Sequence, residues 1–277
     1  MSRLVDMLRN LVRARPRAVG GPRSANGASS FHAIWEMPAE LGPHPQLTEV
    51  SAVLEVRVPP RLRALYFWAL QVDLVDARGK WGVGHTGLQW NPRYPGGTAV
   101  NWGGYASVDQ GGVVLPGTQS PLPGFSDDPN TLSYRWQANR PYRIRVYRSP
   151  ETPEGWRVEV ADLISGTWEV VRDLLPAPGR HTTDSYLSNP FVWSEVFAGC
   201  DAPSVAVRWS DLKALDGAGA EVRPTAVRVS YQAYERGGCP NTDIKVDETG
   251  GVLQVTNTPR IAAQDAKLPL PGQAASV

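Results

Sequence analysis

Aromatic, amide and guanidinium side chains gather in one segment of the chain, between residues 89 and 105, which reads QWNPRYPGGTAVNWGGY. Sugar recognition uses this mixture, because aromatic rings cover the apolar side of a pyranose while amides or arginine bind neighbouring hydroxyls. We therefore expect a carbohydrate-binding site built from Trp90, Asn91, Arg93, Tyr94, Asn101, Trp102 and Tyr105. The alternative is that the tryptophans fill the protein core and the loop only connects two strands.

Catalytic residues in a recognisable arrangement are missing from the sequence. A glycosidase needs two carboxylates about 5.5 Å apart, or somewhat further for inversion, and the best acidic candidates are Glu195 and Asp201, which span the turn before Cys200. The four histidines are scattered and no Gly-x-Ser-x-Gly nucleophile elbow occurs. His85 is expected to be a hydrogen-bonded structural residue. The sequence thus favours a protein without catalytic residues, although an enzyme stays open.

Metal and cofactor motifs are equally scarce. His, Cys and Asp do not cluster at ligand spacing, and the string SDDPN at 126–130 is typical of an Asx-rich turn rather than a calcium site. The glycines at Gly82, Gly84 and Gly87 do not open a helix as a phosphate loop would. We expect neither a metal nor a cofactor.

Cys200 and Cys239 are the two cysteines of the chain, and both stand in glycine-containing turns. They do not form a Cys-x-x-Cys pair, so a redox or zinc motif is unsupported. A disulfide between them is expected if the protein is exported, and two free thiols are expected if it is not.

The overall charge is nearly balanced, with 28 Lys and Arg against 27 Asp and Glu. No electrostatic argument therefore favours nucleic acid as a partner. The N-terminal segment 1–17 has leucines at helical spacing among arginines, and these charges interrupt any signal-peptide core. No apolar run approaches the length of a transmembrane helix. A cytoplasmic protein is the default expectation, with a secreted or cell-surface protein as the alternative.

The elements that must position these residues are short strands. Segments with strand patterns occur at 49–58, 64–75, 80–90, 99–108, 131–137, 142–148, 155–163, 167–174, 205–209, 226–234, 243–246 and 252–256. A short helical turn is predicted at 211–215. We expect three regions: a basic helix and flexible linker over 1–30, a β-sandwich domain over 31–258, and a disordered tail over 259–277.

Three segments, 66–73 (YFWALQVD), 84–91 (GHTGLQWN) and 99–105 (AVNWGGY), have a familiar order and spacing. Together with YRIRVYR at 142–148 and the hairpin at 156–174, they resemble an uncharacterised bacterial family of the concanavalin A-like lectin/glucanase superfamily. The resemblance covers roughly 45–260. It implies an all-β fold of two antiparallel sheets, a jelly roll, which in this superfamily carries lectins, glycosidases, lyases and inert modules.

The aromatic cluster and this resemblance together predict a non-catalytic carbohydrate-binding module whose partner is a glycan. Two alternatives stay open. One is a glycoside hydrolase or lyase with divergent acidic residues, and the other is a structural or protein-interaction module without a small ligand. The sequence does not predict an oligomeric state.

Overall fold

Strands make up almost all the regular structure in the computed structural model, which describes residues 27–180 and 184–271. The prediction of an all-β fold is confirmed. The helical elements are single 3-10 turns: Ala39–Leu41 (η1), Pro95–Gly97 (η2), Val108–Gln110 (η3) and Tyr234–Arg236 (η4). The predicted N-terminal basic helix lies outside the described residues. Within 27–180 and 184–271, no helix is long and apolar enough to cross a membrane.

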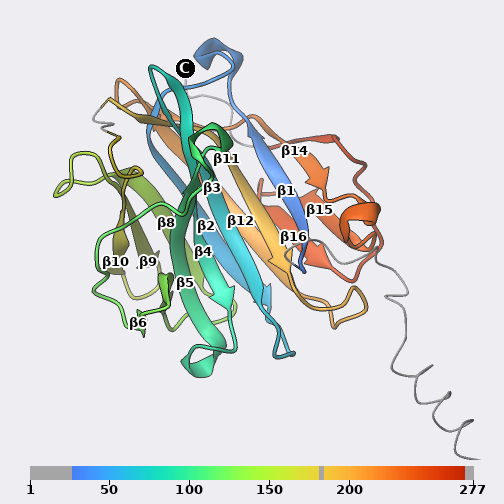
Figure 1. Ribbon diagram of the computed structural model, residues 1–277. Helices are drawn as coiled ribbons and strands as arrows, with labels where there is room; N and C mark the ends of the chain where they lie inside the picture. The colour runs from blue at the N-terminus through green and yellow to red at the C-terminus, as the bar shows by residue number, and fades with distance from the viewer. Residues whose placement is uncertain (1–26, 181–183, 272–277) are drawn as a thin grey trace, which may run out of the picture.

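The first sheet has the order β17–β14–β1–β11–β3–β4–β5–β7–β6, and all its neighbouring strands are antiparallel. Its strands are β1 (Ser29–Glu36), β3 (Tyr66–Asp76), β4 (Gly79–Trp90), β5 (Thr98–Ala106), β6 (Gly124–Phe125), β7 (Asp128–Ser133), β11 (Tyr186–Val196), β14 (Ala226–Tyr231) and β17 (Lys267–Pro269). Figure 1 shows β1 between β11 and β14, two strands that lie far from β1 in the sequence.

The second sheet has the order β15–β16–β12–β2–β8–β9–β10 and is also antiparallel, with β13 forming a hairpin with β12. Its strands are β2 (Leu47–Val58), β8 (Pro141–Arg148), β9 (Trp156–Asp162), β10 (Thr167–Leu174), β12 (Ala206–Asp216), β13 (Glu221–Val222), β15 (Thr242–Val246) and β16 (Val252–Thr256). A single residue pair, Leu187 with Leu47, joins β11 to β2 and so connects the two sheets.

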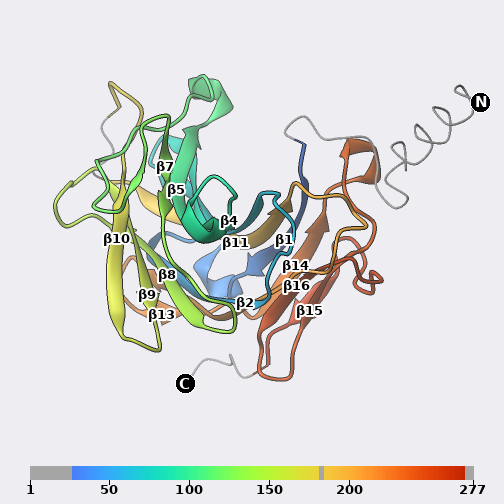
Figure 2. The same cartoon turned by 90° about the horizontal axis from the view of Figure 1, so that it is seen from below.

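The core lies between the two sheets. Strands of the first sheet, including β4, β11 and β1, run in an arc across the middle of Figure 2, and β2 of the second sheet lies below them. Alternate side chains of both sheets meet inside. Five tryptophans are fully buried: Trp68, Trp81, Trp102, Trp156 and Trp209. With Trp35 and Trp136, seven of the ten tryptophans belong to the main core and so serve packing.

Two parts of the predicted organisation differ from the structure. The helical turn predicted at 211–215 is wrong, because these residues belong to strand β12. Residues 213–215 pair with β2, whereas Asp211, which has a positive φ, and Leu212 form an irregularity in the register. The predicted disordered tail is instead folded as far as residue 271. There Lys267–Pro269 forms β17 against β14, and the backbone N–H groups of Ile261 and Ala262 donate to the Asp243 carboxylate.

Candidate functional site

The predicted aromatic platform is divided between the two sides of the first sheet. Trp90 and Trp102 point inward, because in β4 and β5 they alternate with outward residues. Trp102 is completely buried, and its indole N–H donates to the Trp156 carbonyl at 2.9 Å. The indole of Trp90 donates to the Leu62 carbonyl at 3.0 Å and its ring packs against the core. Trp102 therefore presents no ring face to a sugar, and Trp90 lies half-buried against the core.

The other predicted site residues lie around β5 and β7, and most are engaged within the protein. Tyr94 is buried, with its hydroxyl 2.6 Å from the Thr131 carbonyl, and the Asn101 amide donates to the Thr131 hydroxyl at 3.0 Å. Arg93 pairs with Asp127, and its guanidinium lies 4.5 Å above the Phe125 ring. The Asn91 amide donates to Gln89. Tyr105 alone of the predicted aromatic residues points outward with half of its surface exposed.

Apart from Tyr105, sequence reasoning missed a second group of rings, on the face of the first sheet that points away from the second sheet. We call this face the outer face. Phe67, Ala69, Trp193 and Phe191 form a small apolar cluster there, separate from the main core. Histidine and tyrosine rings extend it into the outer ring cluster, which consists of His32, Phe67, His85, Tyr105, Phe191 and Trp193.

The rings of this cluster pack closely around His85. Its imidazole centroid lies 5.9 Å from Phe67, 5.9 Å from Tyr105 and 6.1 Å from Trp193. The Tyr105 ring is stacked on the imidazole, with an angle of 28° between the planes. Burial among these rings disfavours the charged imidazolium and lowers the pKa of His85 to about 4. His85 is therefore neutral at neutral pH and can accept a proton.

Gln71 stands directly opposite His85, on the neighbouring strand β3. Its side-chain oxygen accepts a hydrogen bond from the indole N–H of Trp193 at 3.1 Å. Because the oxygen is engaged, the amide is fixed with its NH₂ group directed away from Trp193. An oriented amide donor thus stands beside a neutral imidazole.

Two carboxylates of the described outer face, Asp73 and Glu195, do not form a pair. Asp73 is held by Lys80 at 2.7 Å and by the amide of Asn189 at 2.9 Å. Glu195 is opposite Phe67, six residues along β3 from Asp73, which corresponds to about 20 Å at the usual rise of a strand. This separation is well beyond the spacing of a glycosidase pair. The other sequence candidate, Asp201, is exposed in the turn after Cys200.

A further cavity, of about 650 Å³, lies beside β15 and is lined mostly by aliphatic side chains. Its charged residues are Lys245, Glu248 and the acids Asp243 and Asp247, and these two acids already accept several hydrogen bonds. Within residues 27–180 and 184–271, three or more His, Cys, Asp or Glu side chains nowhere meet in a geometry that would hold a metal ion.

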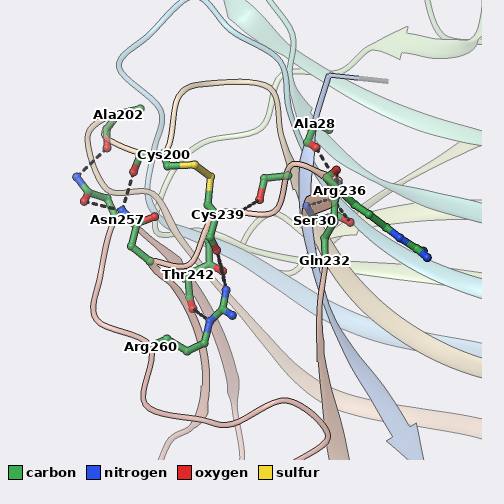
Figure 3. Close-up of a disulfide and its surroundings, with 12 residues drawn as sticks. Ala28, Ser30, Cys200, Ala202, Gln232, Arg236, Cys239, Thr242, Asn257 and Arg260 are labelled. Atoms are coloured by element: carbon green, nitrogen blue, oxygen red, sulfur yellow. Dashed lines mark hydrogen bonds between the residues drawn. A yellow bond between two sulfur atoms is a disulfide. The ribbon is translucent and has the colours of Figure 1, made fainter. Parts of the chain in front are cut away.

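Cys200 and Cys239 form a disulfide at one end of the sandwich, with 5.5 Å between their Cα atoms (Figure 3). The bond joins the turn after β11 to the turn before β15. Arg260 donates to the carbonyls of Cys239 and Thr242, and Asn241 donates to the carbonyl of Cys200. The disulfide stands outside the outer ring cluster and serves to tie these turns together.

No protein-family model and no curated protein matches the chain. Among solved structures, it is similar to SCP-B, a member of the eqolisin family of peptidases in complex with the tripeptide Ala-Ile-His (11% identity, 82% of this chain and 98% of that chain, TM-score 0.43). It is also similar to the alginate lyase vAL-1 from Chlorella virus (10% identity, 81% of each chain, TM-score 0.33).

The sequence predicted a non-catalytic carbohydrate-binding module, and the structure overturns the site on which that prediction rested. That prediction is wrong. Its physical basis was a stacking platform of Trp90 and Trp102, but Trp102 is fully buried between the sheets and Trp90 is half-buried against the core. The outer face instead presents groups that can move a proton.

Proposed function

We propose that the protein is a lyase that cleaves an acidic polysaccharide by β-elimination on the outer face of the first sheet. One observation carries this proposal: His85 is neutral, stacked on Tyr105 and directly opposite Gln71. A base, a proton donor and an amide that can bind an anionic oxygen thus stand side by side. General acid–base catalysis requires groups of these kinds within reach of one substrate unit.

The proposed reaction uses these three groups in one step. The imidazole of His85 takes the proton from the carbon next to the carboxylate of a uronic acid unit. The electron pair of that C–H bond forms a carbon–carbon double bond, and the bond from the neighbouring carbon to the glycosidic oxygen breaks. The Tyr105 hydroxyl gives its proton to the departing oxygen, while the Gln71 amide donates to the carboxylate as negative charge gathers on it.

A pKa of about 4 makes free His85 a weak base. A substrate carboxylate beside the imidazole favours the protonated form and so raises this pKa in the complex. The strength of the base is therefore coupled to the presence of the acidic substrate. A neutral sugar would not produce this effect.

Elimination agrees better with the outer face than hydrolysis does. A glycosidase needs an acid and a second carboxylate that serves as base or nucleophile, and the acids of the described outer face are far apart or paired. Elimination needs neither a second carboxylate nor a water molecule. The partly exposed rings of Phe191 and Tyr105 beside the site offer surfaces for the apolar side of neighbouring sugars.

The test is an activity screen of the purified chain on acidic polysaccharides, including polygalacturonate, alginate and hyaluronan. Elimination creates a double bond conjugated with the carboxylate, so ultraviolet absorbance must rise together with the number of reducing ends. We expect His85→Gln to lower the rate by about 10²–10⁴-fold, whereas His44→Gln, at an exposed position, should leave it unchanged. New reducing ends without ultraviolet absorbance would mean hydrolysis and would refute the lyase.

The disulfide supports a location in an oxidising compartment. We therefore place the secreted or cell-surface alternative ahead of the cytoplasmic default. Thiol titration of the protein denatured directly from its native cells, under non-reducing conditions, tests this. Two reactive thiols per chain would return the protein to a reducing compartment.

A further inference from the structure

Arg172 is a buried cation without an acidic partner among the described residues. It lies on β10 with 4% of its surface exposed, and burial alone lowers its pKa. Its Nη1 group donates to the Pro129 carbonyl and, at 3.0 Å, to the Asn130 side-chain oxygen. A guanidinium buried without a carboxylate is costly for folding. The hydrogen bonds of its side chain hold one short segment of β7, Pro129 and Asn130.

Asn130 connects this cation to the outer face. Its side chain lies over Gly103 of β5, since a Cβ atom at Gly103 would come within 2.9 Å of the Asn130 amide nitrogen. Gly103 is the residue directly opposite His85. Only a glycine at this position leaves room for the amide. The Asn130 side chain therefore occupies the place beside His85 that a β5 side chain would otherwise fill.

The polar side chains on the two sides of His85 are thus both amides. Gln71 stands on the β3 side with its oxygen bound to the Trp193 indole, and Asn130 stands on the β5 side with its oxygen bound to Arg172. In both amides a protein donor engages the oxygen, and the NH₂ group is left to donate. Two N–H donors on either side of one imidazole suit a ligand that carries negative oxygens between them.

We propose that Asn130, positioned by Arg172, binds the carboxylate of the substrate together with Gln71, so that the site selects uronic acid units over neutral sugars. This inference rests on the proposed lyase for its catalytic meaning, but it concerns binding and can be measured without turnover. Asn130 touches the substrate, whereas Arg172 acts through Asn130 as a positioning residue.

The experiment is a titration of the ¹⁵N-labelled full chain with galacturonate and, separately, with galactose, followed through the side-chain amide resonances. In the native protein, galacturonate should shift the Asn130 and Gln71 signals and galactose should not. Asn130→Asp keeps an oxygen that Arg172 can bind, and so preserves the fold, but it loses the donor and adds a negative charge. We expect this variant to bind galacturonate about tenfold more weakly or worse.

Arg172 is tested by two further variants. Arg172→Met should weaken galacturonate binding and broaden or move the free Asn130 signal, because the amide loses its anchor. Arg172→Lys, which can still donate to the Asn130 oxygen, should restore part of the affinity. A merely structural role would not produce this order. Asn139→Asp, on an exposed turn, adds the same charge elsewhere and serves as the matched control.

The outcomes separate the two proposals. Galacturonate binding that Asn130→Asp leaves unchanged, or no binding by the native protein, would overturn the inference even if the chain proves to be a lyase. Binding that depends on Asn130 in a protein that cleaves no polysaccharide would refute the lyase and support this carboxylate site.

Discussion

Acid should destabilise this protein through the two half-buried histidines of the outer ring cluster, His32 and His85. Burial lowers the pKa of His85 and of His32 to about 4, whereas a histidine in an unfolded chain has a pKa of about 6.5. Between these two values the unfolded chain binds a proton at each position and the folded chain does not. The stabilisation is therefore complete above about pH 6.5 and is lost as the pH falls toward about 4.

The magnitude follows from the two pKa values. Their difference is worth at most about 3.4 kcal/mol of unfolding free energy for each histidine, and about 2.5 kcal/mol of this is already lost near pH 4.5. His85→Gln removes one proton-binding site from both states. On acidification from about pH 7 to about pH 4.5, the native protein should therefore lose about 2.5 kcal/mol more of its unfolding free energy than this variant does.

The assay is equilibrium unfolding in urea, followed by tryptophan fluorescence, at both pH values. His44→Gln is the matched control, because that ring is exposed, and it should lose as much stability as the native protein. Equal losses in the native protein and in His85→Gln would refute the reasoning. They would show that the His85 imidazole takes up its proton in the folded state without a penalty from burial.

Three other substitutions test the fold. Trp102→Ala should lower the unfolding free energy by about 3–5 kcal/mol, because it leaves a cavity between the sheets; a loss below about 1 kcal/mol in urea unfolding would contradict the buried placement. The double variant Cys200→Ser with Cys239→Ser removes the crosslink between residues with a sequence separation of 39, and we expect it to lower the unfolding free energy by up to about 4 kcal/mol. A reductant added to the native protein should lower the unfolding free energy by the same amount. Asp173→Asn breaks a buried pair in which the Arg157 Nε lies 2.7 Å from the carboxylate; we expect a loss of about 3–5 kcal/mol by thermal or urea unfolding, and an unchanged midpoint would show that the pair is dispensable.

Much of the sheet architecture could be predicted from local pattern alone. The segment at 142–148 alternates apolar and charged residues, and the structure has β8 over Pro141–Arg148. The segment at 64–75, apolar on both faces, becomes β3 in the middle of the first sheet. Side-chain alternation in a strand is a property of the backbone, so a short window of sequence carries it.

Strand β11 was not predicted, although it lies at the centre of the first sheet between β1 and β3. It contains Asn189 with a positive φ and then Pro190, both of which signal a turn in a local window. The register with β3 shifts between Ser188 and Phe191, and this irregularity accommodates the two residues. Only the pairing of segments more than a hundred residues apart makes a strand of this sequence.

The sequence by itself determined the class of fold and the residue types available for chemistry. It did not determine which side of the sheet each residue occupies relative to the core. Asn101 and Trp102 are adjacent in the chain but face opposite sides of the first sheet, so a cluster in sequence was not a cluster in space. Conversely, Gln71, His85, Asn130 and Trp193 come from four strands, and the tertiary structure brings them to one face. Which face of a strand is buried depends on strands distant in sequence, and for this reason only the tertiary structure could decide the site.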